Sequence, residues 1–285
     1  MKILFYIFSL VLIGYCKCEL IQKSNTDINS ASLNSAQISY SDSKNLYTLN
    51  LATNKITTNI QLKSDKINTI KLNNENLIAG LDSGYLIQIS PKGDKEILID
   101  PIKTGIIDSI TSINFIKDKI ILTIGSNHLI IYDEINKIYK ISNLNLKSKI
   151  TTTHIINDNL YISTFDRNIY NINLRNLTTD KISTTPSIPT AIHSVNNEII
   201  IGLINGELIY KNQIYKVSNN QISAIKIYKN NIYIADWSSN LYIYDFNLNL
   251  KNSIKIGNDA IMDMFINTNS QIILWNRAIY SCGIE

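Results

Sequence analysis

The chain has 285 residues, a formal net charge of +4 and a charged fraction of only 18%. Its lysines are scattered, without a basic run or an aromatic-interleaved basic patch, so nucleic-acid binding is not expected. This length suits one all-β domain of barrel or propeller size, whose core is large enough to need no disulfide staples.

The N-terminus looks like an export signal. Lys2 precedes an apolar run over residues 3–13, which is too short to span a membrane but has the length of a signal-peptide core. Small residues follow, at Gly14, Cys16 and Cys18. We therefore expect a signal peptide over 1–18, cleaved after Cys16 or Cys18, and a mature domain over 19–285. A lipid anchor and a retained N-terminal anchor are the alternatives.

Export has two consequences for the rest of the chain. If Cys16 and Cys18 leave with the signal, Cys282 remains alone and no intramolecular disulfide is expected. A single N-x-S/T sequon, at Asn176, among many asparagines favours a bacterial periplasm. Secreted and lipid-anchored forms are the alternative locations, and no transmembrane span is expected after signal removal.

One pattern of apolar strands and polar turns repeats along the chain. Residues 150–174 (ITTTHIINDNLYISTFDRNIYNINL) and 222–246 (ISAIKIYKNNIYIADWSSNLYIYDF) align position by position. Units return roughly every 38 residues, the period of four-stranded propeller blades. The predicted second strands are Gln37–Tyr40, Leu77–Leu81, Ile120–Ile124, Leu160–Thr164, Ile199–Leu203, Ile232–Asp236 and Ile272–Trp275. The predicted third strands are Leu46–Leu51, Tyr85–Ile89, Leu129–Tyr132, Ile169–Leu174, Glu207–Tyr210, Leu241–Phe246 and Ala278–Cys282.

These seven hairpins predict an all-β, seven-bladed β-propeller. Six or eight blades would require one hairpin to be misread. The last unit lacks a fourth strand, and residues 19–24 are placed to supply it and close the ring, which removes an open sheet edge. A β-sandwich is less favoured, because runs such as 120–122 and 199–201 are apolar on both faces. In the hairpin turns, Gly84 and Gly206 are expected at positive φ, with Asn168 and Asn240 in the same role.

The repeats resemble WD40-like or quinoprotein-like propeller blades over nearly the whole mature chain. The Gly-His and Trp-Asp dipeptides of WD40 repeats and the Trp-docking motifs of quinoprotein blades are absent. In outline the chain is similar to the NapL family of accessory propellers, which some bacteria encode with their periplasmic nitrate reductase. This resemblance implies an accessory or maturation role for a periplasmic redox enzyme.

The repeat also groups polar residues. His154 and His193 occupy one position in adjacent units, and Lys71, Asn114 and Lys226 occupy it in others. We expect these five residues to form a polar ring at one mouth of the central channel. They are the candidate ligand-binding residues, for an anion or, with the two histidines, a metal. No third metal ligand is evident, so no metal and no cofactor are predicted.

No catalytic residues are predicted. The chain has no G-x-S-x-G motif, no repeated carboxylate pair and no phosphate-binding glycine loop. The remaining acids near unit boundaries are expected to be solvated turn residues, namely Asp108, Asp236, Asp259 and Asp263.

A protein partner is predicted instead. Trp237 falls in a turn, whereas Trp275 is expected to pack between blades. The insertion Ser90–Ile107 lengthens the second unit, and we expect it to contribute Lys92, Asp94, Lys95 and Lys103 to partner binding. The sequence therefore predicts a non-catalytic periplasmic scaffold. The alternatives are a small-ligand, metal-binding or enzymatic propeller with its site at the channel mouth, and an outer-membrane assembly propeller.

Overall fold

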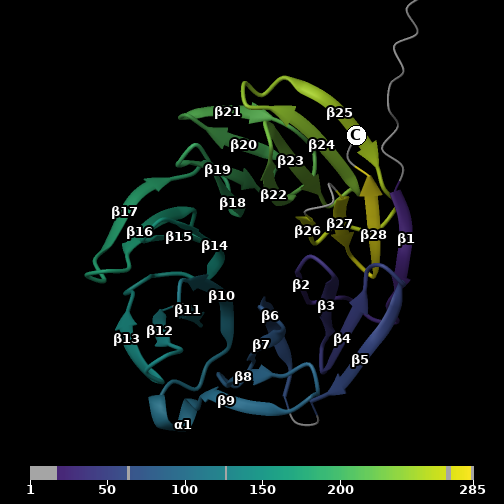
Figure 1. The fold of residues 1–285 in the computed structure, drawn as a ribbon. Coiled ribbons are helices and arrows are strands. Elements are labelled where there is room, and N and C mark those ends of the chain that lie inside the picture. The colour runs from purple at the N-terminus through teal and green to yellow at the C-terminus, as the bar shows by residue number, and fades with distance from the viewer. Residues whose placement is uncertain (1–17, 63–64, 126, 268–270, 284–285) are drawn as a thin grey trace, which may run out of the picture.

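The computed structural model describes residues 18–62, 65–125, 127–267 and 271–283. It contains seven four-stranded antiparallel sheets. Figure 1 shows the sheets arranged as blades around a common centre, with β1 beside β28. The predicted seven-bladed all-β propeller is therefore confirmed, with blade 1 formed by β2–β5 and blade 7 by β26–β28 and β1.

Blades 1–6 each use four consecutive strands in order from the centre outward, and blade 7 takes β1 as its outer strand (Figure 1). The inner strands are β2 (Ser30–Leu33), β6 (Ile67–Asn73), β10 (Ile110–Ile116), β14 (Ile150–Ile156), β18 (Pro189–Val195), β22 (Ile222–Tyr228) and β26 (Asp263–Ile266). The second strands are β3 (Gln37–Asp42), β7 (Asn76–Leu81), β11 (Lys119–Ile124), β15 (Asn159–Thr164), β19 (Glu198–Leu203), β23 (Asn231–Asp236) and β27 (Gln271–Trp275).

The third strands are β4 (Asn45–Asn50), β8 (Leu86–Ile89), β12 (His128–Asp133), β16 (Asn168–Asn173), β20 (Glu207–Tyr210), β24 (Asn240–Asp245) and β28 (Ala278–Gly283). The outer strands are β5 (Lys55–Gln61), β9 (Lys95–Ile99), β13 (Ile138–Asn143), β17 (Thr179–Thr184), β21 (Gln213–Lys216), β25 (Leu250–Lys255) and β1 (Cys18–Lys23). All seven predicted hairpins are present, with ends within one or two residues of the prediction.

The core lies between neighbouring blades. Ile78 of blade 2, for example, shares a buried cluster with Ile120 and Leu122 of blade 3. Second strands such as β11 and β19 are therefore apolar on both faces, as the sequence indicated, because each face packs against a different neighbour. Outer strands such as β13 and β17 are largely exposed.

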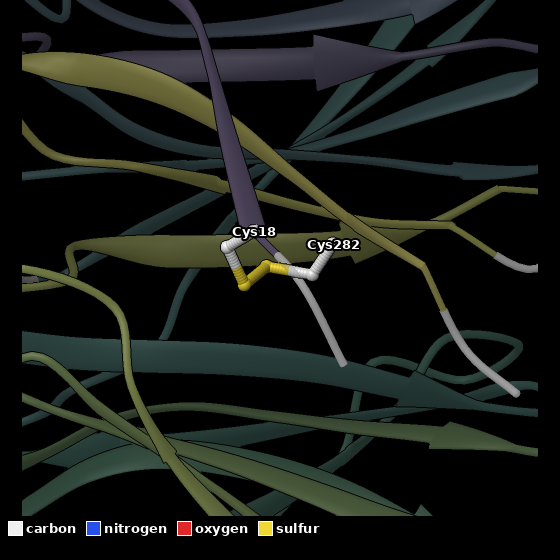
Figure 2. The surroundings of a disulfide bond; sticks show 2 residues. All are labelled: Cys18 and Cys282. Atoms are coloured by element: carbon white, nitrogen blue, oxygen red, sulfur yellow. A yellow bond between two sulfur atoms is a disulfide. The ribbon is translucent and has the colours of Figure 1, made fainter. Parts of the chain in front are cut away.

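The N-terminal segment closes the ring. Strand β1 pairs antiparallel with β28, so the predicted completion of the last blade is confirmed. Figure 2 shows the disulfide between Cys18 and Cys282, which are 264 residues apart in sequence and directly paired in register. The expectation of no intramolecular disulfide was wrong, because it assumed that Cys18 leaves with the signal. Cleavage after Cys18 would also remove one partner of this bond. The rest of the expected signal peptide, with Cys16, lies outside the described residues.

The antiparallel order divides the blade connections between two faces of the ring. Turns from second to third strands and connections from outer strands to the next blade lie on one face, which we call face 1. Turns from first to second and from third to fourth strands lie on the opposite face 2. Helix α1 (Pro101–Thr104) lies in the connection from β9 to β10, on face 1. The Asp100 side chain caps it by accepting from the Ile102 N–H at 2.9 Å.

The hairpin turns on face 1 confirm part of the predicted turn chemistry. Gly84 and Gly206 have φ of 91° and 78°. The other two assignments were one residue too late, because Arg167 (φ 70°) and Ser239 (φ 68°) occupy the left-handed position instead of Asn168 and Asn240. These asparagines begin the third strands, where Asn240 bonds back into the turn.

Candidate functional site

The central channel holds the predicted polar ring. Its cavity has a volume of about 510 Å³, within the usual range of ligand sites. All five predicted ligand residues line it, each as the fifth residue of a seven-residue inner strand: Lys71, Asn114, His154, His193 and Lys226. Inner strands run from face 1 to face 2, so the ring lies in the half of the channel nearer face 2.

The two histidines lie side by side. The ring centroids of His154 and His193 are 4.4 Å apart, and His154 Nε2 lies 3.2 Å from Ser194 Oγ. Burial, the neighbouring His193 and the two channel lysines lower the pKa of His154 to about 3. Burial and Lys226 lower the pKa of His193 to about 4. Both rings are therefore neutral at physiological pH.

The two lysines differ in their partners. Lys226 Nζ lies 3.2 Å from Asp263 Oδ1, on the next inner strand. Lys71 is partly buried and has neither a hydrogen bond nor an ion pair among the described residues. Burial and Lys226 lower the pKa of the Lys71 ammonium, with Asp263 opposing them. Asp263 is the one carboxylate among the described residues that line the cavity.

Other polar side chains of the channel bind neighbouring inner strands. Asn114 donates to Thr153 Oγ1 at 3.2 Å, and Thr190 Oγ1 donates to the Ile222 carbonyl at 2.6 Å. Ser32 accepts from the Leu72 N–H at 2.8 Å. Asn114 therefore contributes to the packing of blades 3 and 4, which distinguishes it from Lys71.

Asp236 and Asp263 are not the solvated turn residues that the sequence predicted. Asp263 lies in the channel, and Asp236 is fully buried at the end of β23. The Asp236 carboxylate accepts from Ser218 Oγ at 2.5 Å, from the Asn240 N–H at 2.9 Å and from the Tyr242 hydroxyl at 3.1 Å. Burial alone would raise the pKa of Asp236, but hydrogen bonds from Ser218, Asn240 and Ser238 lower it. The carboxylate therefore holds the turn that carries Trp237.

Three consecutive blades expose a large apolar side chain at the same turn position on face 1. We call Phe165, Ile204 and Trp237 the apolar arc. They follow the last residue of β15, β19 and β23, and their exposed fractions are 59%, 39% and 48%. The sequence singled out Trp237 alone. Comparing the residue after each second strand would have found the other two.

Each turn of the apolar arc also carries a cation. Arg167 lies two residues after Phe165 and is exposed. Lys216 Nζ donates to the Asn205 carbonyl at 2.7 Å, and Lys255 Nζ donates to the Ser238 carbonyl at 2.9 Å. Face 1 over blades 4–6 therefore combines exposed apolar side chains with three cations, and the exposed Asp166 lies in the same turn as Arg167.

The structure divides the other predicted partner-binding residues between the two faces. Lys103 lies in α1 on face 1, as does Trp237 in its turn. Lys92 and Asp94 lie in the turn before β9 and Lys95 begins that strand, so these three lie at face 2. The insertion is not a single loop, because β9 is the regular outer strand of blade 2. Trp275 is only 3% exposed and stacks on Phe265 at 4.9 Å, so its predicted packing is confirmed.

The described residues lack two features. They contain no group of three or more His, Cys, Asp or Glu side chains that could hold a metal ion. Within the same ranges, no helix is both long and apolar enough to cross a membrane.

Comparison with known proteins supports the fold. No protein-family model matches the chain, and no curated protein matches it significantly in sequence. Among solved structures, a chain of the mitotic checkpoint complex aligns with a TM-score of 0.78 and 10% identity, covering 94% of this chain and 91% of that one. The computationally designed Ika8 protein aligns with a TM-score of 0.71 and 11% identity, covering 92% and 98%. Fold and comparisons define the chain as a seven-bladed β-propeller.

Proposed function

We propose that this propeller is a non-catalytic binding scaffold that holds a partner protein on face 1 over blades 4–6. The apolar arc is the observation that carries the proposal. Large apolar side chains, rigidly displayed and close to cations, are typical of interface anchors. The positive flanks fit a partner surface in which apolar side chains are surrounded by carboxylates.

The local structure supports this role because it fixes the anchors before binding. The buried Asp236 carboxylate binds both ends of the Trp237 turn. In blade 4, Thr164 Oγ1 donates to Asp166 at 2.5 Å and Asn168 Nδ2 donates to the same carboxylate at 2.8 Å. Turns held in this way lose little conformational entropy on association, which favours affinity.

The location and the identity of the partner are also part of the proposal. The N-terminal sequence supports export to a periplasm, and the outline resemblance to NapL propellers supports a redox enzyme such as nitrate reductase as the partner. Both rest on the sequence alone. The apolar arc specifies the chemistry of the partner surface and does not depend on either.

The test compares capture of a partner by three forms of the full-length exported protein. These are the wild type, Phe165→Ser/Trp237→Ser, and a matched control, Ile135→Ser, in the turn before β13 on face 2. Ile135 is 71% exposed, so all three forms should unfold at similar temperatures. We expect the double variant to bind the captured protein at least about 30-fold more weakly, equivalent to about 2 kcal/mol, and the control to bind normally. The proposal would be refuted if Phe165→Ser/Trp237→Ser bound the captured protein as tightly as the wild type, or if only Ile135→Ser weakened binding.

A further inference from the structure

The central channel contains hydrogen-bond donors that the fold does not use. The ammonium of Lys71 is unpartnered among the described residues, although it sits in a partly buried cavity. Lys226, on the far side of the ring in blade 6, has one carboxylate at 3.2 Å and donors to spare. A cation without an anionic partner in such a place is costly to the free protein.

The histidine pair adds a further donor. The backbone N–H of Ser194 lies 2.8 Å from His193 Nδ1, and in the tautomer in which Nδ1 accepts this hydrogen bond the neutral ring carries its proton on Nε2. Within the described residues, that Nε2 has no hydrogen-bond partner. The inner strands of blades 2, 5 and 6 thus each direct an unused or underused N–H group into one cavity.

The charges of the cavity favour an anion. With both histidines neutral, Lys71 and Lys226 face a single carboxylate, Asp263, so the described lining carries a net charge of about +1. A cation would face both ammonium groups and find only Asp263 and two imidazoles as ligands. A doubly charged oxyanion has enough acceptors for both ammonium groups and the imidazole N–H.

We propose that the channel is a binding site for a small oxyanion of the phosphate or sulfate type, held by Lys71 and Lys226 with the adjacent His154–His193 pair beside it. The site is distinct from the apolar arc, because it lies in the half of the channel nearer face 2. Neither the scaffold role nor the binding of a protein partner requires this oxyanion.

Binding at this site is coupled to protonation of the histidines. Besides burial, Lys226 lowers the pKa of both rings, Lys71 and the neighbouring His193 lower that of His154, and Asp263 raises that of His193. A bound dianion opposes the lysines and raises both pKa values. The complex then takes up protons that the free protein does not hold, so affinity rises as pH falls. A protonated His193 can donate from Nδ1 to the Ser194 carbonyl 3.1 Å away.

Calorimetric titration of the full-length protein at constant ionic strength tests the site. Sulfate is the probe for pH dependence, because it stays a dianion throughout the range in which the histidines titrate. We expect one sulfate per chain, affinity several-fold higher at pH 5.5 than at pH 7.5, and a heat that varies with the buffer as protons are taken up. Inorganic phosphate and glycerol 3-phosphate at pH 7.5 distinguish a free ion from the phosphate group of a larger molecule.

Variants separate the site from general attraction to a basic surface. We expect Lys71→Met and Lys226→Met each to weaken sulfate binding at least about tenfold, and His154→Gln/His193→Gln to remove the pH dependence. Lys216→Met, an exposed lysine on face 1, is the matched control and should bind normally. Phe165→Ser/Trp237→Ser should also bind normally, so failure of this site and failure of the scaffold role are distinguishable. Absence of saturable binding, equal losses in Lys71→Met and Lys216→Met, or affinity that rises with pH would overturn the inference.

Discussion

Blades 7 and 1, where the ring closes, differ from blades 2–6 at one repeat position of the inner strand. The two closing blades carry Phe265, which stacks on Trp275, and Ser32, which accepts from the Leu72 N–H. Blades 2, 4, 5 and 6 carry lysine or histidine there, with few partners. At this position Phe265 packs against the cluster shared with blade 1 and Ser32 joins blade 1 to blade 2, whereas the lysines and histidines of the other blades face the cavity. We infer that the side chains of blades 7 and 1 at this position contribute to packing, whereas the lysines and histidines of blades 2, 4, 5 and 6 are available to a ligand.

Of the changes considered, removal of the disulfide should have the largest effect on the stability of the protein. The bond joins residues 264 apart, and loops of this length give stabilisation of about 3 to 5 kcal/mol by restricting the unfolded chain. We expect Cys18→Ala/Cys282→Ala to lower the melting temperature by about 10 °C. Reductant should lower that of the wild type equally and leave the variant unchanged. Arg277→Ala, which removes only the exposed ion pair with Asp27, is the control and should cost less than about 1 kcal/mol. An unchanged melting temperature without the disulfide would contradict its stabilising role at the seam.

Acid should destabilise the protein through the histidine pair. The folded-state pKa values of about 3 for His154 and 4 for His193 lie below the ordinary value of 6.5. Below pH 6.5 the unfolded chain therefore binds protons that the folded state does not, and stability falls by up to about 1.4 kcal/mol per pH unit for each ring. Urea unfolding should show His154→Gln/His193→Gln losing about 2 to 4 kcal/mol less than the wild type between pH 7 and pH 4.5. His128→Gln, outside the channel, is the control. If the free energy of unfolding changed equally with pH in the wild type and the double variant, the low pKa values assigned to the two histidines would be contradicted.

The smallest expected effect is a gain in stability. Lys71→Met replaces a partly buried ammonium that has no ion-pair partner among the described residues, so the free protein should become about 1 kcal/mol more stable. Thermal unfolding in anion-poor buffer should show a rise of a few degrees, whereas Lys71→Arg, which keeps the charge, should show none. A loss of stability in Lys71→Met would mean that this lysine contributes to the fold like the seam residues.

The sequence predicted more of the fold than of the site. Hairpin positions follow from local alternation and turn chemistry, so β7, β15 and β23 start within one residue of their predicted positions. The repeat register also placed His154 and His193 together, because equivalent positions of adjacent blades must meet around a ring. The partner of Cys18 was not predictable in this way, since it depends on the pairing of strands 264 residues apart.

Burial and the choice of face were also hidden from the sequence. Asp236 looked like a turn residue because nothing local shows that Ser218 and Tyr242 surround its carboxylate. Lys92 and Lys103 are close in sequence but lie at opposite faces, because the chain crosses the blade as β9 between them. A residue can be assigned to a face only when all four strands of its blade have been identified. The interpretation of Ser90–Ile107 as an insertion hid the fourth strand, β9.

The pairing of β1 with β28 also imposes an order in time. At synthesis rates of about 5 to 20 residues per second, the first strand waits roughly 13 to 50 seconds for its partner to be made. Until then Cys18 has no Cys282 to meet, and blade 7 keeps an open edge. A chain cut short before β28 can form neither the sheet nor the bond. The disulfide therefore forms only in molecules whose last blade has been synthesised.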